Sequence, residues 1–227
     1  MASLRLSPMK FEYTGLHLAV IFGHEAIVRM LLSKTEVTDW TTWRKETPLH
    51  LAVQHGHDTL VRFLAQERGS SEEKGRNGYT ALHVAALKGR DTIVQLLIEN
   101  GAHVKAQDFN ERTALHLAAM EGHADVTMTL LSAMDSSDII MRDVRSLTAL
   151  HYAAHYDKRD VVKCLLQRMN EGDVALKDRE GKTALCYAED MVVQKMLLKA
   201  LGDPDREMPI ASRQLQAMEL LFGLTAG

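Results

Sequence analysis

The sequence predicts an all-α protein made of six similar repeats, each a helix, a turn, a second helix and an extended finger. Three observations support this fold class: a recurring threonine motif, a glycine nine residues after four of the threonines, and aliphatic pairs at helical spacing beyond it. The motif occurs as TGLHLAV from Thr14, TPLHLAV from Thr47, TALHVAA from Thr80, TALHLAA from Thr113, TALHYAA from Thr148 and TALCYAE from Thr183. Successive threonines are 33, 33, 33, 35 and 35 residues apart.

Each part of the repeat has a local physical reason. We expect each first helix to begin at the motif threonine, whose hydroxyl can cap free backbone N–H groups of the first turn. Pro48 takes the first helical position of the second repeat, where a missing N–H is tolerated. A glycine such as Gly56 then ends the helix, because glycine adopts left-handed backbone conformations at little cost. In the fingers we expect side chains five residues before a threonine to bond nearby backbone, namely Asp108, Asp143 and Asp178.

A period of 33 residues with the pattern T-P-L-H-x-A is typical of ankyrin repeats, and the sequence resembles ankyrin-repeat proteins over about residues 10–200. The resemblance implies an ankyrin-repeat solenoid, in which helix–turn–helix–finger units stack into a curved rod. Each repeat would bury its apolar face only against its neighbours, so most contacts would be local. The resemblance also implies a non-catalytic protein–protein interaction module.

The repeats divide the chain into three parts. We expect an N-terminal segment (1–13), six repeats over residues 14–201, and a C-terminal tail (202–227) with a capping helix. The repeats span residues 14–46, 47–79, 80–112, 113–147, 148–182 and a truncated 183–201. The fourth and fifth each gain two residues, near MDSSDII and MNEGDVA. In the sixth, Val192–Val193 follows Val161–Val162 by 31 residues rather than 35, which predicts four residues fewer between its helices.

Both ends leave alternatives open. The tail carries one apolar helical stripe, which we interpret as a lid over the last repeat, with a partner-docking helix or a frayed tail as alternatives; the stripe consists of Ala211, Leu215, Met218 and Phe222. The first repeat is more apolar than an outer repeat should be. Either residues 1–13 fold over it, or the chain belongs to a longer protein.

Composition excludes several classes of protein. The 227 residues, 46% of them hydrophobic, suffice to bury a core. A net charge of −3 argues against a nucleic-acid binder that works by neutralising phosphates. The sequence has no apolar run of about 18 residues that would insert into a membrane. Two cysteines cannot form a disulfide framework, which favours a reducing compartment. We expect a monomeric intracellular protein of the cytoplasm or nucleus.

The histidines indicate structure rather than metal binding or catalysis. Eight of the eleven belong to the repeat: five follow a motif threonine by three residues, and His24, His57 and His123 follow a turn glycine. His151 and His155 are spaced i, i+4, which can seed a zinc pair, but no third ligand is apparent. We therefore expect no metal.

No other pattern indicates an enzyme or a cofactor. The sequence lacks the nucleophile motif G-x-S-x-G and a glycine-rich phosphate loop. We interpret Cys164 and Cys186 as small buried residues. The polar loop ERGSSEEKGRNG is expected to be a mobile, solvated finger, with phosphorylation of Ser70 or Ser71 as the less favoured alternative.

The resemblance also implies where a partner would bind. In ankyrin proteins partners usually lie along a concave surface, formed by the fingers and by exposed positions at the end of each first helix. Seven of the twelve aromatic residues occur at such positions, interleaved with arginines, and these residue types dominate binding hot spots. The candidate partner-binding residues are Tyr13, Phe22, Trp43, Arg44, His55, Arg76, Tyr79, Leu87, Phe109, Arg112, Met120, Arg145, His155 and Tyr156.

The chemistry of this surface fits a protein or peptide partner with acidic and apolar groups. As an alternative, some of the rings pack onto the neighbouring finger. Stacking on single-stranded RNA is disfavoured, because the chain has no basic excess. A second function remains open, in which these repeats are the regulatory or targeting region of a larger enzyme or receptor.

Overall fold

The computed structural model describes residues 14–34, 41–42, 45–66 and 70–202. The chain falls into two compact units, unit 1 (Met1–Phe109) and unit 2 (Asn110–Gly227). Three expectations lie outside the described residues: the N-terminal segment, the C-terminal helix over residues 211–222, and the placement of the candidate partner residues Tyr13, Trp43 and Arg44.

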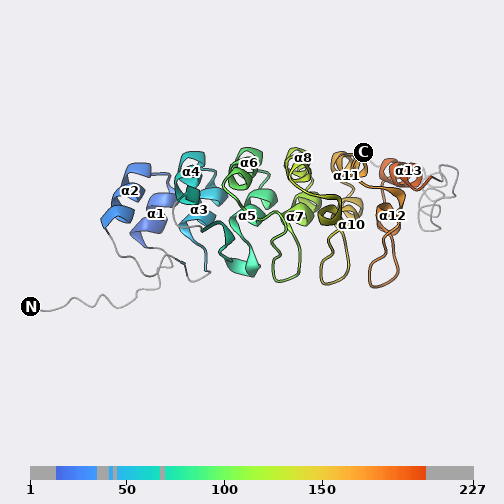
Figure 1. Cartoon of the computed structure of the whole chain (residues 1–227), viewed down its shortest axis with the longest axis horizontal. Coiled ribbons are helices and arrows are strands. Elements are labelled where there is room, and N and C mark those ends of the chain that lie inside the picture. The colour runs from blue at the N-terminus through green and yellow to red at the C-terminus, as the bar shows by residue number, and fades with distance from the viewer. Residues whose placement is uncertain (1–13, 35–40, 43–44, 67–69, 203–227) are drawn as a thin grey trace, which may run out of the picture. The chain divides into compact units, whose positions relative to one another are not determined.

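Unit 1 consists of helix pairs joined by tight turns (Figure 1). The first helices α1, α3 and α5 pack side by side, and each packs against its own second helix, α2, α4 or α6. Small and branched apolar residues of α3 and α5, such as Ala52 and Leu82, are fully buried between them. The bounds are α1 (Gly15–Ile21), α2 (Glu25–Lys34), α3 (Pro48–His55), α4 (Asp58–Gln66), η1 (Ser70–Glu72), η2 (Arg76–Gly78), α5 (Ala81–Leu87) and α6 (Asp91–Glu99).

Unit 2 repeats this pattern and adds a short helix in each of two connections. Helix α7 packs on α10, and α8 packs on α11, which packs on α13. The described residues contain no β-strand, only an isolated bridge between Lys177 and Thr183. The bounds are α7 (Ala114–Glu121), α8 (Ala124–Ser132), α9 (Ser136–Ile139), α10 (Ala149–His155), α11 (Arg159–Leu166), α12 (Glu171–Val174), η3 (Ala184–Cys186) and α13 (Met191–Ala200).

The two-residue insertions fold as single helical turns. Asp135 is the N-cap of α9 and Asn170 the N-cap of α12, and each forms a reciprocal capping box with the aspartate three residues later. The extra residues therefore form a capped turn, which satisfies backbone N–H groups that an open loop would leave to solvent.

The sixth repeat is shortened by three residues, so the prediction of four was wrong. The residues before α11 and α13, Lys158 and Asp190, are 32 positions apart, against 35 for the threonines. In this register Val193 and Gln194 take the fully buried places of Val161 and Val162. The prediction aligned Val192–Val193 with Val161–Val162. It was wrong because Gln194, a polar residue, occupies the position that corresponds to Val162. Gln194 fits there by donating its side-chain amide to the Ala188 carbonyl at 2.8 Å.

A threonine–histidine pair starts five of the first helices and ties neighbouring repeats together. In every pair the histidine Nδ1 accepts the threonine backbone N–H at 3.0–3.2 Å. Because that N–H must donate, Nδ1 is unprotonated and Nε2 carries the hydrogen. In the pairs of His50, His116 and His151, Nε2 then donates to the carbonyl before the next threonine, at 2.8 Å to Tyr79, 3.2 Å to Leu147 and 3.3 Å to Lys182. The structural interpretation of these histidines is confirmed.

The turn between the paired helices requires a left-handed residue. Gly122 has φ +92°, and a Cβ added there would lie 2.7 Å from Lys158 of the next repeat, so both backbone and space favour glycine. In the next turn Asp157 adopts φ +50°. Its side chain accepts the Asp190 N–H at 2.9 Å, which offsets the strain of a non-glycine residue.

Two expectations about local structure were wrong. Residues 70–78 are not an open loop. They contain the short helical turns η1 and η2, Ser71 is buried, and the Glu72 carboxylate accepts the His103 backbone N–H at 2.9 Å. Cys186 is exposed rather than buried, because the short η3 leaves it at the surface, where its sulfur lies 3.7 Å from the Thr183 hydroxyl. Cys164 is buried, as expected.

Candidate functional site

Backbone hydrogen bonds join neighbouring fingers at one place in unit 1 and at two places in unit 2 among the described residues. In unit 1 the Phe109 N–H donates to the Asn77 carbonyl at 3.0 Å. In unit 2 the Val144 N–H donates to Asn110 at 3.0 Å, and the Arg179 N–H donates to Arg145 at 3.2 Å. These bonds fix the spacing between fingers, so side chains at corresponding finger positions lie next to one another.

Buried aspartates brace the two fingers of unit 2 that precede Thr148 and Thr183. Asp143 Oδ1 accepts the backbone N–H groups of Arg145 and Leu147, each at 2.8 Å, and Oδ2 accepts the Tyr152 hydroxyl at 2.8 Å. Asp178 and Tyr187 make the same arrangement in the last finger. The predicted bonding of these aspartates to nearby backbone is confirmed, and each carboxylate also anchors a tyrosine from the following helix.

We call each Asp–Tyr pair, Asp143–Tyr152 and Asp178–Tyr187, a brace, and these pairs affect the charges at the base of the fingers. Burial, together with the hydrogen bond to Asp143, raises the pKa of Tyr152 to about 12, and the same causes raise the pKa of Tyr187 to about 12. Burial acts to raise the pKa of Asp178, but the bonds from Tyr187 and the backbone outweigh it and hold that pKa below its usual value. Both phenols are therefore neutral and Asp178 is ionised at neutral pH.

In unit 1 the predicted partner residues differ in exposure. Phe22 and Phe109 are largely exposed, and Phe109 exposes 71% of its surface. The Phe109 ring lies against Gly78, which has φ +79°; a Cβ there would come within 2.6 Å of the ring. Tyr79 is half-buried, because its ring stacks on His83 with centroids 5.8 Å apart. The other predicted residues of this unit are at the surface: His55 and Arg76 are exposed, and Leu87 is half-buried.

In unit 2 the predicted residues cluster with a ring that the sequence analysis missed. His155 and Tyr156 are exposed and contact edge to face, with centroids 4.8 Å apart. His155 also lies 5.7 Å from the ring of Tyr187, over which the Lys182 ammonium sits at 5.8 Å. Tyr187 was missed, although Asp143/Tyr152 and Asp178/Tyr187 share a spacing of nine residues that would have revealed both braces.

Guanidinium groups stand beside this aromatic cluster. Arg145 is exposed and Arg112 half-buried, and both act to lower the pKa of Tyr152, which places them near the Asp143–Tyr152 pair. Met120 is half-buried at the end of α7. The fingers of unit 2 thus combine positive charge with partly exposed rings, which suits a partner that has both carboxylates and apolar groups.

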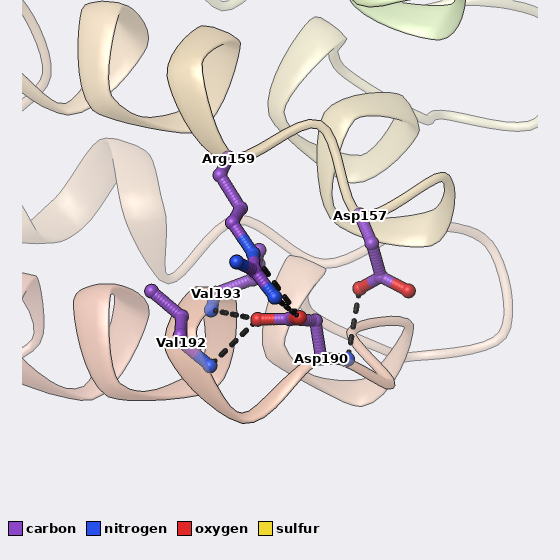
Figure 2. Close-up of polar contacts among 5 residues, drawn as sticks. All are labelled: Asp157, Arg159, Asp190, Val192 and Val193. Atoms are coloured by element: carbon purple, nitrogen blue, oxygen red, sulfur yellow. Dashed lines mark hydrogen bonds and ion pairs between the residues drawn. The ribbon is translucent and has the colours of Figure 1, made fainter. Parts of the chain in front are cut away.

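A second polar cluster, at the start of α13, has a structural role (Figure 2). Asp190 Oδ1 caps the helix by accepting the N–H groups of Val192 at 2.7 Å and Val193 at 3.1 Å, while its Oδ2 accepts the Arg159 guanidinium. The Arg159 hydrogen bond holds the pKa of Asp190 below its usual value. The cluster therefore ties α13 to the fifth repeat.

Two kinds of site are absent among the described residues: a group of metal ligands and a membrane-spanning helix. In the described ranges no three His, Cys, Asp or Glu side chains group in a way that could hold a metal ion. His151 uses both ring nitrogens within the protein, so it is not poised to pair with His155 as a ligand. None of the helices seen in the structure has the length and apolar character needed to cross a bilayer.

Comparison with known families agrees with the repeat pattern. A family model described as ankyrin repeats, in three copies, matches residues 4–72, 66–143 and 115–207. These overlapping ranges span most of the 227 residues. Together with the helix pairs of both units they confirm the predicted resemblance and the all-α repeat fold. No curated protein matches the chain.

Proposed function

Because the chain belongs to the ankyrin-repeat family, whose repeats are protein–protein interaction modules, we propose that it binds a partner protein or peptide through its fingers and first helices. The exposure of large rings on a braced backbone carries this proposal. Phe109 exposes 71% of its surface and Tyr156 exposes 46%, although aromatic side chains usually bury most of their area. On this proposal the chain acts by binding and not by catalysis.

The partner's chemistry follows from the neighbouring charges. Arg76 in unit 1 and Arg145 in unit 2 are exposed finger residues, and guanidinium groups form strong paired hydrogen bonds with carboxylates. A partner segment with acidic and apolar side chains would place its carboxylates on the arginines and its apolar groups on the rings. The finger-to-finger hydrogen bonds hold these side chains in place beforehand, which lowers the ordering cost of association.

Alanine variants test which surface binds. Affinity capture from cell extract identifies partners, and titration calorimetry then compares Phe109→Ala and Tyr156→Ala with Met128→Ala. Met128 is the matched control, because it lies on second helix α8, away from the fingers, and is 51% exposed. We expect each ring variant to weaken binding at least about tenfold, roughly 1.4 kcal/mol, with circular dichroism unchanged. Unaltered affinity in both ring variants would exclude this surface.

A further inference from the structure

Two neighbouring fingers of unit 2 expose four cationic side chains. We call them the basic fingers and define the first by Arg142 and Arg145. The second is defined by Lys177 and Arg179, and all four side chains are exposed. Two hydrogen bonds join these fingers: the Arg142 guanidinium donates to the Lys177 carbonyl at 3.2 Å, and the backbone N–H of the second arginine pair, from Arg179, donates to the Arg145 carbonyl at 3.2 Å. The four cations therefore lie on one continuous part of the surface.

The carboxylates of the same fingers are already used within the protein. Asp143 and Asp178 are buried, and each accepts two backbone N–H groups and a tyrosine hydroxyl. The exposed carboxylate of Glu180 pairs with Lys182 at 2.8 Å. Among the described residues, none of the four cations that define the basic fingers forms an ion pair. The basic fingers therefore present positive charge to solvent without a carboxylate beside it at the surface.

This positive charge is local. In the finger of unit 1 that contains η2, Glu72 and Glu73 balance Lys74 and Arg76, and the whole chain carries a net charge of −3. A long polyanion such as a nucleic acid would meet that net negative charge as well as the basic fingers. A short acidic segment would meet mainly the fingers, because salt screens charges beyond about 8 Å at physiological ionic strength. The charge distribution therefore favours a short acidic segment as the occupant.

We propose that the basic fingers bind an acidic run of a partner protein, a segment in which Asp or Glu side chains follow one another closely. The proposed binding function is assumed here, and the charged part of the partner is assigned to these two fingers. Guanidinium groups bind carboxylates through two parallel hydrogen bonds, and three of the four cations are arginines. The half-buried ring of Tyr187 adjoins the second finger through its bond to Asp178, so an apolar side chain beside the acidic run would contact that ring.

Fluorescence anisotropy with labelled peptides and the full chain tests this assignment. The probe is a short peptide of glutamate and phenylalanine residues, and the control peptide has glutamine in place of every glutamate. The finger variant, Lys177→Glu/Arg179→Glu, reverses two exposed charges of the basic fingers. The matched control variant, Lys163→Glu/Lys195→Glu, changes the net charge equally at exposed positions of the second helices α11 and α13 in the same unit.

We expect the wild type and the control variant to bind the glutamate peptide at least about tenfold more tightly than the glutamine peptide, and the finger variant to lose this preference. Added salt should weaken the preference, because it screens exposed charges. Equal binding of both peptides by the wild type, or an unchanged preference in the finger variant, overturns the proposal.

Two further outcomes separate this proposal from its alternatives. Tighter binding of single-stranded RNA than of the glutamate peptide, lost in the finger variant, would overturn it, because phosphates would then occupy the basic fingers. A captured partner that loses affinity in Tyr156→Ala but keeps it in the finger variant would also overturn the acidic run. That last result would leave the proposed binding surface standing, so the two proposals can fail separately.

Discussion

Tyr152 and Tyr156 differ by one turn of helix but have opposite roles. Tyr152 is buried and donates its hydroxyl to Asp143, which in turn accepts two backbone N–H groups of its finger. Tyr156 exposes 46% of its surface at the end of the same helix. The sequence alone placed Tyr156 on the surface by its position in the repeat. The sequence did not show that Tyr152, unlike Tyr156, is buried and bonded to Asp143, because both are tyrosines of one short apolar stretch.

Removal of the Tyr152 hydroxyl should destabilise unit 2. In Tyr152→Phe the Asp143 carboxylate stays buried but loses one of its donors, which should cost about 1–3 kcal/mol in the free energy of unfolding. Chemical denaturation followed by circular dichroism measures this change. Tyr156→Phe is the matched control and should change stability by less than about 0.5 kcal/mol. Equal stability of the two variants would mean that the brace contributes nothing.

At the scale of elements, the repeat motif predicted most helices and failed where the chain departs from it. Five threonine–histidine pairs start five helices as expected. Helices α9 and α12 were not foreseen, because their capping residues lie in insertions that the motif does not describe. The register of α13 was misjudged by one residue, since a buried glutamine, whose side-chain amide donates to the Ala188 carbonyl, takes the place of an aliphatic residue there.

Helix α13 depends on the Asp190 cluster in Figure 2. Asp190→Ala removes the cap of two backbone N–H groups and the contact with Arg159, which should cost about 1–2 kcal/mol. We expect amides of α13 to exchange faster while those of α7 keep their rate, as measured by hydrogen-exchange mass spectrometry. Asp160→Ala, an exposed aspartate on α11, serves as the control and should leave both helices unchanged. A similar effect of both variants would argue against the cap.

At the scale of the whole molecule, buried histidines in both units link stability to pH. Burial lowers the pKa of His50 in unit 1 and of His151 in unit 2, partly opposed by their bonds to backbone carbonyls. The unfolded chain takes up protons on these residues near pH 6.5, whereas the folded chain resists doing so. The contribution of these two histidines to the free energy of unfolding is therefore complete above about pH 6.5. It is lost as the pH falls through their lowered pKa values in the folded protein.

Denaturation midpoints measured between pH 7.5 and 5 should therefore fall steadily. The double variant His50→Gln/His151→Gln should be less stable at pH 7.5 but should show a shallower decline over the same range. An identical decline in the variant would assign the pH dependence to other groups. Below about pH 4 a further loss is expected, because Asp178 and Asp190 have lowered pKa values and must then be protonated.

The binding surface could be predicted from the sequence only in outline. Position in the repeat identified Phe109, His155 and Tyr156 as exposed, and the structure agrees. It could not show that Tyr79 stacks on His83, nor that Tyr187 joins His155, because ring orientation depends on contacts between neighbouring repeats. Spacing gives the place of a side chain on an element, whereas its exposure depends on what the next element packs against it.

Hydroxyl-radical footprinting with and without a captured partner tests the proposed surface most directly. If the fingers and first helices bind the partner, oxidation of Phe109 and Tyr156 should fall at least about threefold on binding. Read as an occupancy ratio, this corresponds to roughly 0.7 kcal/mol. Oxidation of Met128 on α8 should not change. Protection of Met128 with unchanged labelling of both rings would show that the partner binds the second helices instead, and would contradict the account.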